Sequence, residues 1–424
     1  MGDKVVIGIT GSFGSGCTTV TQALKEYFGF KPYSLSLFLR EEWSRQHSGE
    51  SAEKAVRSEL QDLGNRLRKE KSLSILAEET YKKVREEGNQ SENLAFDSIR
   101  NPAEIAFFRS IFPDFYVIAV DCAEADRWER VRLYYEKYKM TKTDFLKDDE
   151  RDKNEDGIIY GQQVALCVDE ADYLIRNDNE PMVTTQRAIM GKLRGKLEDP
   201  VKLFHGELRP PTEKEAYMSV AYAASLLSHC FKRQVGAVII DERGIVVSIG
   251  YNENSKPLKP CYDEFGDCYR EMYAEQIMAT FKACPFCKKE LNGLTYPYRC
   301  PHCQRNIYHE IVRDRALGRC TALHAEEKAI INARSASLIG CALYVTTFPC
   351  FTCAQKILNA DMQSICYVES YPDVDSIKLF ETAGKKGRTI LMDKFEGVKA
   401  RTYFKLFSAW RREKETKMLK TRLK

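Results

Sequence analysis

The 424-residue sequence contains no uninterrupted apolar run long enough to span a membrane. Its opening residues also lack the charged region, apolar region and small-residue cleavage site of a secretory signal. The total of fifteen cysteines is odd, which does not fit a framework of paired disulfides. These absences predict a cytoplasmic protein outside the membrane, and they leave metal binding or thiol chemistry as the role of the cysteines.

Excess positive charge is also missing from most of the chain. The formal net charge is +4, and residues 411–424 alone contribute +5, with seven basic and two acidic side chains. The rest of the chain therefore carries −1, which disfavours a nucleic-acid-binding protein. We interpret 411–424 as a separate basic tail, more typical of a solvated terminus than of a nucleic-acid contact.

The length and the strand pattern predict an α/β protein with two domains. In the first half, apolar strands at 4–10, 93–99, 115–122 and 171–177 alternate with helical stretches, which predicts a parallel sheet with helices on both faces. The alternation stops between 190 and 212. A proline pair and the capping-box pattern Thr212-x-x-Glu215 then predict entry into a second domain. We place the domains at 1–200 and 208–410.

Residues 11–19 read GSFGSGCTT and follow the first predicted strand. They have the glycines of the phosphate-binding loop G-x-x-x-x-G-K-[ST], but Cys17 replaces its lysine. A thiol cannot stabilise the charge of phosphoryl transfer as an ammonium does. Backbone amides and the helix N-terminus can still bind phosphate. Three interpretations stay open: a regulatory nucleotide site, a relic used in assembly, and an unusual active kinase.

The first half resembles small P-loop nucleotide kinases of the dephospho-CoA and deoxynucleotide kinase kind, in the order RSELQDLGNRLR, FDSIRNPAEIAFFR, VDCAEADRWERVR and ADYLIRND. The resemblance implies a nucleotide site with Mg²⁺ organised by an acidic residue at a strand end. Its predicted residues are Gly11, Ser12, Gly14, Ser15, Gly16, Cys17, Thr18, Thr19 and Asp97. Arg57, Arg100 and Arg109 are predicted either to contact phosphate or to form surface ion pairs.

The second half contains His324-Ala325-Glu326 and Pro349-Cys350-Phe351-Thr352-Cys353. The pattern H-x-E…P-C-x-x-C is the signature of zinc deaminases that act on cytosine or adenine. His324, Cys350 and Cys353 supply three ligands for a catalytic Zn²⁺, which leaves a fourth position for activated water. Glu326 then takes the water proton, passes it to N3 of the base and protonates the departing ammonia. The alternative is a structural zinc, but a closed structural site takes four ligands.

A second set of cysteines has the spacing C-x₂-C-x₁₂-C-x₂-C of a zinc ribbon: Cys284, Cys287, Cys300 and Cys303. Four thiolates close the coordination shell, so we predict a structural zinc in an insertion at about 256–320. A disulfide pair and a nucleic-acid knuckle are the alternatives. Cys261, Cys268, Cys320 and His302 either complete a further metal site or, for the cysteines, are free buried thiols. The remaining histidines fit no ligand pattern: His47, His205, His229 and His309.

The second half resembles the deoxycytidylate deaminase family beyond the zinc pattern, in RPPTEKEAYMSVAYAAS, SHCFKRQVGAVIID, SIGYNENSKP, YVESYPD and FEGVKARTYFKLF. The resemblance implies a three-layer α/β/α domain that converts dCMP and water to dUMP and ammonia. It also implies control by a nucleotide effector bound to the first half, and assembly into a homo-oligomer. The predicted substrate contacts are Asn252, Ala325, Tyr371, Lys232 and Arg233.

Simpler roles stay open for some of these residues, namely a turn for Asn252 and a solvated strand edge for Lys232 and Arg233. The sequence departs from the family pattern at 253–255 and at Asp361. The phosphate count of the substrate is therefore open, and dCTP, as the substrate of a nucleotide-depleting defence enzyme, is the alternative to dCMP. Two other classes are a polynucleotide-editing deaminase and a non-catalytic nucleotide-binding regulator.

Overall fold

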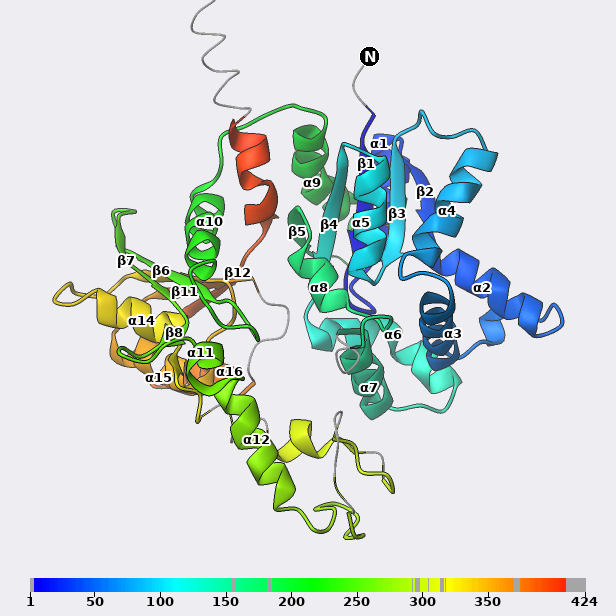
Figure 1. Cartoon of the computed structure of the whole chain (residues 1–424). Coiled ribbons are helices and arrows are strands. Elements are labelled where there is room, and N and C mark those ends of the chain that lie inside the picture. The colour runs from blue at the N-terminus through cyan, green and yellow to red at the C-terminus, as the bar shows by residue number, and fades with distance from the viewer. Residues whose placement is uncertain are drawn as a thin grey trace, which may run out of the picture. The chain divides into compact units, whose positions relative to one another are not determined.

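The computed structural model describes residues 4–153, 158–180, 183, 185–291, 293, 298–303, 305–312, 316, 318–368 and 374–408. The chain divides into two compact units, Met1–Glu215 with Glu396–Lys424, and Ala216–Phe395 (Figure 1). Within the described ranges, no helix combines the length and the apolar character needed to cross a membrane.

The first unit is built on a six-stranded sheet of order β13-β5-β4-β1-β3-β2. Five strands are parallel: β1 (Val6–Thr10), β2 (Lys31–Ser34), β3 (Leu94–Ile99), β4 (Phe115–Asp121) and β5 (Tyr173–Arg176). The two-residue strand β13 (Gly397–Val398) pairs antiparallel with β5. The predicted α/β class with a parallel sheet is confirmed.

Helices of this unit connect the parallel strands or follow the last of them. They are α1 (Cys17–Phe28), α2 (Leu35–Gln46), α3 (Arg57–Glu70), α4 (Ile75–Glu86), α5 (Pro102–Ile111), α6 (Glu124–Lys137), α7 (Lys142–Lys153), α8 (Val164–Asp169) and α9 (Gln186–Phe204), with a short 3₁₀ turn at Ala52–Lys54. Figure 1 shows them around the sheet. The loop between β1 and α1 is the glycine-rich segment, so it lies at the carboxyl edge of the parallel strands.

Helices cover both faces of this sheet. Ala95 of β3 belongs to the apolar core that also contains Val20 of α1 and Leu193 of α9. Its neighbour Phe96 stacks instead on Phe108 of α5, with ring centroids 4.2 Å apart. Because successive strand side chains point to opposite faces, α1 and α9 cover one face and α5 covers the other.

Residues 396–408 belong to the first unit, although their resemblance to the end of the deaminase family had assigned them to the second domain. Val398, Leu406 and Phe407 are buried in the core formed with α1 and α9. The ammonium of Lys399 is also buried, and it donates to the main-chain carbonyls of Val168 and Asp169 at the end of α8. The antiparallel β13–β5 pairing and this apolar contact explain the difference.

The second unit has a five-stranded sheet of order β12-β11-β10-β6-β7. Three strands are parallel: β10 (Ala342–Val345), β11 (Ser364–Tyr367) and β12 (Leu391–Lys394). Strand β6 (Gly236–Ile240) is antiparallel to both β10 and β7 (Val246–Tyr251). The associated helices are α10 (Glu213–Ser225), most of which lies in this unit, α14 (Ala325–Asn332), α15 (Phe351–Asn359) and α16 (Val374–Lys385).

Helix α10 begins with the predicted capping box. The Thr212 amide donates to Glu215 Oε2 over 2.7 Å, and the Glu215 amide donates to Thr212 Oγ1 over 3.2 Å. These reciprocal bonds satisfy two amides at the helix start, so the prediction from the Thr-x-x-Glu pattern is confirmed.

Strand β7 and helix α14 approach each other closely at a glycine. A Cβ on Gly250 would lie 2.1 Å from the carbonyl oxygen of Ala325 and 2.4 Å from the amide nitrogen of Ala329. Ser248 on the same strand donates through Oγ to the Ala329 carbonyl over 2.7 Å. Glycine at 250 therefore lets α14 lie directly against the sheet.

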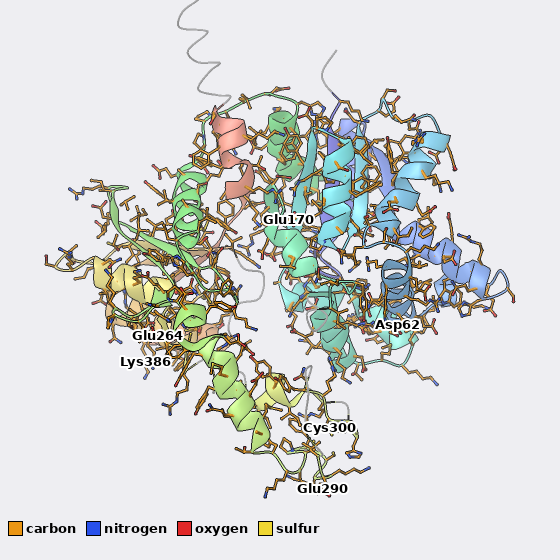
Figure 2. The ribbon with its side chains drawn as sticks, viewed as in Figure 1. Asp62, Glu170, Glu264, Glu290, Cys300 and Lys386 are labelled. Atoms are coloured by element: carbon orange, nitrogen blue, oxygen red, sulfur yellow. The ribbon has the colours of Figure 1, made fainter. Side chains whose placement is uncertain are left out.

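An insertion leaves and rejoins this unit at a short ladder, where β8 (Glu253–Asn254) pairs antiparallel with β9 (Ala322–Leu323). Between these strands lie α11 (Cys261–Phe265), α12 (Tyr269–Ala279) and a π-helical turn (Tyr308–Val312). The cysteine-rich lobe, residues 281–312, follows α12 and contains the labelled Cys300 and Glu290 (Figure 2). Its small core includes Leu291 and Ile307 and is shared with Met278 of α12.

Candidate metal centre and nucleotide cavity

Two helices of the second unit begin at the predicted zinc ligands. His324 is the residue that caps the start of α14, and Cys350 is the residue that caps the start of α15. The Nδ1 atom of His324 lies 3.3 Å from the Sγ atom of Cys350 and 3.4 Å from that of Cys353. All three ligand atoms lie within 4.8 Å of one another.

The cluster has the size and the chemistry of a zinc site. Bond lengths of about 2.1 Å to nitrogen and 2.3 Å to sulfur, at tetrahedral angles, separate the two ligand atoms by roughly 3.6 Å. The observed N–S distances are a few tenths of an ångström shorter. A hydrogen bond from Cys353 and the neighbouring His324 lower the pKa of Cys350 to about 4. One thiolate is therefore available at neutral pH, while the hydrogen bond to Cys350 raises the pKa of Cys353, and a donor set of one imidazole and two sulfurs fits Zn²⁺.

Glu326 occupies the first turn of α14, two residues after His324, and only 3% of its surface is exposed. Burial raises the pKa of its carboxyl group above the usual range, and the nearby His324 opposes that shift. Ala325 between them is fully buried. The structure thus brings the predicted acid–base residue into the first helical turn that follows a ligand.

An ion pair that the sequence analysis missed joins the two ligand-bearing helices. The amide of His324 donates to Glu327 Oε2 over 2.9 Å, and Glu327 Oε1 pairs with the ammonium of Lys356 on α15. This contact fixes the start of α14 relative to α15. A glutamate three residues after a capping position was the signal that could have indicated it.

The four ribbon cysteines also lie together. Sγ–Sγ distances are 3.7 Å for Cys284 to Cys303 and 3.7 Å for Cys287 to Cys300. Four sulfurs around one Zn²⁺ lie roughly 3.8 Å apart, whereas a disulfide bond is about 2.05 Å long. Each half is a tight turn closed by an amide-to-carbonyl bond, from Cys284 to Lys289 and from Cys300 to Arg305. The set fits a closed four-thiolate zinc site.

The predicted substrate contacts are less uniform. Asn252 is nearly buried, its Oδ1 accepts from the Val235 amide over 2.8 Å, and its Nδ2 donates to the Arg233 carbonyl over 2.8 Å. These bonds give Asn252 a structural role, because they join the residue after β7 to the segment before β6. The ammonium of Lys232 is 3.7 Å from Glu271. Tyr371 lies outside the described residues.

Lys232 and Asn252 line a small cavity of about 100 Å³. Cys261, Cys268 and Cys320 line the same cavity. Among the residues that the structure describes, neither these three cysteines nor His302 belong to a cluster that could bind a metal ion. Burial raises the pKa of Cys320, which agrees with a protonated thiol there.

The first unit contains a larger cavity of about 660 Å³ beside the glycine-rich loop. The lining residues that the sequence predicted are Gly11, Ser12, Gly14, Gly16, Cys17, Thr18, Thr19, Arg57 and Arg100. Gly16 has a φ of +99° and packs against Asn177, whose Nδ2 would be 2.5 Å from a Cβ at residue 16. Glycine is therefore required at this helix start.

Other predicted residues of this site are placed differently. Ser15 is fully buried and outside the cavity lining, and Asp97 is also buried away from it. Arg109 pairs with Glu170 and Asp172 rather than reaching the cavity. Burial raises the pKa of Cys17 to about 11, so its thiol is neutral.

Several cavity residues were not predicted from the sequence: Gln162, Arg130, Asn177 and Lys192. Arg130 donates through Nη1 to the loop carbonyls of Gly14 and Ser15, and Asn177 donates to the Ser15 carbonyl over 2.8 Å. Asn177 follows β5 at the carboxyl edge of the sheet, which is the position where α/β sheets bind ligands. That position was the available signal.

Comparison with known proteins shows which families the chain is similar to. A model described as the cytidine and deoxycytidylate deaminase zinc-binding region matches residues 211–369. The deoxycytidylate deaminase of Saccharomyces cerevisiae is 29% identical over 204 residues, 48% of this chain and 50% of that protein. A UPF0200 protein of Methanothermobacter thermautotrophicus is 30% identical over 200 residues, 46% of this chain and 95% of that protein.

A crystal structure of the dCMP deaminase from the cyanophage S-TIM5, in complex with dCMP and dUMP, is similar over 44% of this chain and 99% of that chain, at 20% identity and a TM-score of 0.27. The matched part of the present chain spans half the length of the yeast relative.

The matched region contains the His-Cys-Cys cluster and Glu326, so the second unit is of the deaminase class. Residues 211–369 are similar to the zinc-binding region of cytidine and deoxycytidylate deaminases, and the chain belongs to the UPF0200 proteins through the 200 residues shared with the archaeal relative.

Proposed function

We propose that the second unit hydrolyses dCMP to dUMP and ammonia, with a zinc ion bound by His324, Cys350 and Cys353. The observation that supports this most is the buried Glu326 beside a cluster of three ligands. Three protein ligands leave one position of a tetrahedral zinc open, which is the arrangement of catalytic rather than structural sites.

When bound, zinc supplies water that is activated near neutral pH. The carboxylate of Glu326 accepts a proton from that water and holds it on a carboxyl oxygen. It delivers this proton to N3 of the cytosine ring as the water oxygen bonds to C4, and a further proton transfer releases the 4-amino group as ammonia. The C4–N bond is broken and a C4–O bond is formed, so one water is consumed for each ammonia.

Substrate contacts are part of the same proposal. Ala325 and Asn252 border the base and sugar, and Lys232 or Arg233 meets the phosphate. Asn252 retains hydrogen-bonding capacity, because an amide has two N–H donors and two acceptor sites and one of each is used within the chain. The cationic side chains favour a nucleotide over a nucleoside.

The first unit is proposed to bind a nucleotide that regulates deamination. The cavity of about 660 Å³ lies within the range of small-molecule sites, and the loop that borders it has phosphate-binding glycines. Asp97 is buried outside the cavity lining, so this proposal does not include a magnesium ion at Asp97. Loss of the lysine at residue 17 favours binding over phosphoryl transfer.

Ammonia release from dCMP, dCTP, cytidine and single-stranded DNA tests the proposed substrate. Each is assayed with zinc-loaded protein, with and without ATP and deoxynucleoside triphosphates. We expect turnover of dCMP that changes with a triphosphate. Turnover of dCTP alone would instead favour nucleotide depletion, and turnover of DNA would contradict a free nucleotide as substrate.

The regulatory site is tested with Gly16→Asp, which adds a side chain and a negative charge where phosphate is expected. The variant should keep its basal dCMP deamination and lose the response to triphosphates. Regulation that survives this change would contradict a role for the loop.

A further inference from the structure

The cavity of the first unit has a phosphate loop that carries no cationic side chain at residue 17. Cys17 is neutral because burial, which outweighs the opposing effects of Ser15 and Arg100, raises its pKa. The cavity nevertheless contains positive charge, since Arg57 of α3 and Arg100, which follows β3, line it together with residues 11–14 and 16–19. These arginines are 43 residues apart in the sequence and meet only in the fold.

A single carboxylate holds both arginines. Asp152 at the end of α7 pairs with Arg57 and accepts from Arg100 Nη1 over 2.9 Å on the same oxygen, while Gln61 Nε2 donates to its other oxygen over 2.6 Å. The exposed fractions of the three charged side chains are 13%, 20% and 1% for Arg57, Arg100 and Asp152. These three side chains together carry one net positive charge in a poorly solvated place, with Asp148 near Arg57 as a further carboxylate, and an anionic ligand in the cavity would be favoured there.

Two hydrogen-bond donors in the cavity wall are also unused. Nε of Arg57 and Nη1 of Arg68 are buried and have no hydrogen-bond partner among the described residues. Both arginines line the cavity, and the side chain of Arg68 is only 1% exposed because its other nitrogens bond to Glu104.

The excess charge lies beside the phosphate loop. The guanidinium carbon of Arg57 is 3.8 Å from the centroid of the Phe13 ring, and Phe13 belongs to the loop. The cation–π contact holds Arg57 against the segment whose amides are available to phosphate.

We propose that Arg57 and Arg100, both paired with Asp152, replace the missing lysine and bind the phosphate chain of a nucleoside triphosphate at the loop. The inference rests on the proposed nucleotide site of the first unit, and it specifies which residues supply the positive charge. The loop amides bind one part of the phosphate chain, and the two guanidinium groups bind another part.

Binding is measured by calorimetry on the full chain, with ATP, dCTP and inorganic tripolyphosphate as probes. Arg57→Gln and Arg100→Gln should each weaken binding of all three probes roughly 10- to 100-fold, the loss typical of a charged hydrogen bond. Asp152→Asn leaves both arginines without a neutralising carboxylate and should tighten binding. Arg109→Gln is the matched control, because Arg109 pairs with Glu170 and Asp172 outside the cavity, and it should leave binding unchanged.

Cys17→Lys provides a test that does not depend on removing a buried contact. It should tighten binding in the otherwise unchanged protein, and it should reduce the loss caused by Arg100→Gln. The inference would be overturned if the two arginine variants bound the probes as tightly as Arg109→Gln does. It would also be overturned if Asp152→Asn bound them more weakly at an unchanged melting temperature. Either result would leave the proposed nucleotide site itself in place. Failure of the unchanged protein to bind any probe would overturn both this inference and the proposed nucleotide site, whereas dCMP deamination is measured separately.

Discussion

A methyl group on Gly250 tests whether close packing of β7 against α14 positions the metal centre. In Gly250→Ala the new Cβ would lie 2.1 Å from the Ala325 carbonyl oxygen and 2.4 Å from the Ala329 amide nitrogen. Non-bonded heavy atoms normally lie roughly 3.5 Å apart. Both obstructing atoms are main-chain atoms of one helix, so α14 must move by about 1 Å or more.

This displacement has two consequences of different size. Overpacking of a core typically costs about 1–3 kcal/mol, and a main-chain obstruction belongs at or above the upper end, so we expect a loss of roughly 3 kcal/mol in the free energy of unfolding. Glu326 and His324 move with α14. A misplacement of about 1 Å at a catalytic group costs on the order of 100-fold in rate.

Urea unfolding measures the first effect, and zinc content and ammonia release measure the second. Gly384→Ala in α16 is the control, because its nearest neighbouring atom would be 3.7 Å away, at Thr389 Oγ1. The same substitution there should stabilise the helix by about 0.5–1 kcal/mol. If Gly250→Ala unfolds and turns over like the unchanged protein, the proposed packing of α14 on the sheet is refuted.

Three further predictions concern other parts of the chain. Arg127→Ala should lower the free energy of unfolding by about 3–5 kcal/mol, because it leaves Asp149 buried without its guanidinium partner. Both side chains are at most 2% exposed. An unchanged melting temperature would contradict this prediction. Burial lowers the pKa of Lys399 to about 8 from an unfolded value of 10.5, so the unfolded state binds more protons between these two pH values. The free energy of unfolding therefore rises with pH in this range, and relative to Lys399→Met the unchanged protein should gain up to about 3 kcal/mol from pH 8 to 10.5. A difference between the two proteins that does not change with pH in urea unfolding would refute this prediction. Cys300→Ser should remove one zinc per chain and speed amide exchange in the cysteine-rich lobe, whereas Cys268→Ser should keep the full metal content; equal zinc in the two variants would contradict the four-thiolate site.

Local patterns in the sequence were sufficient for four strands of the first sheet, β1, β3, β4 and β5, but not for β2 or β13. Apolar runs such as 115–122 gave β4 (Phe115–Asp121), and the Thr212-x-x-Glu215 pattern gave the start of α10. The residues proposed to bind zinc were also indicated locally, because each half of H-x-E…P-C-x-x-C begins a helix. In the fold, the N-termini of these two helices lie close together.

Contacts between distant segments could not be found in this way. Arg57 and Arg100 were recognised as candidates, but their shared partner Asp152 lies 95 and 52 residues away in the sequence. The apolar composition of residues 396–408 does not indicate which of the two units they belong to. The pairing of β13 with β5 assigns them to the first unit. The sequence also did not indicate whether Arg109 contacts phosphate, because its ion-pair partners Glu170 and Asp172 are more than 60 residues away in the sequence.

Ammonia release from dCMP by the zinc-loaded chain and by its Glu326→Gln variant tests the central claim most directly. Glutamine keeps the size of the side chain and cannot carry the proton, so we predict a loss of roughly 100-fold or more in turnover at unchanged zinc content. The unchanged protein should release one ammonia for each dUMP formed. Turnover that survives Glu326→Gln, or a zinc-loaded protein that leaves dCMP intact with and without triphosphates, would contradict the account.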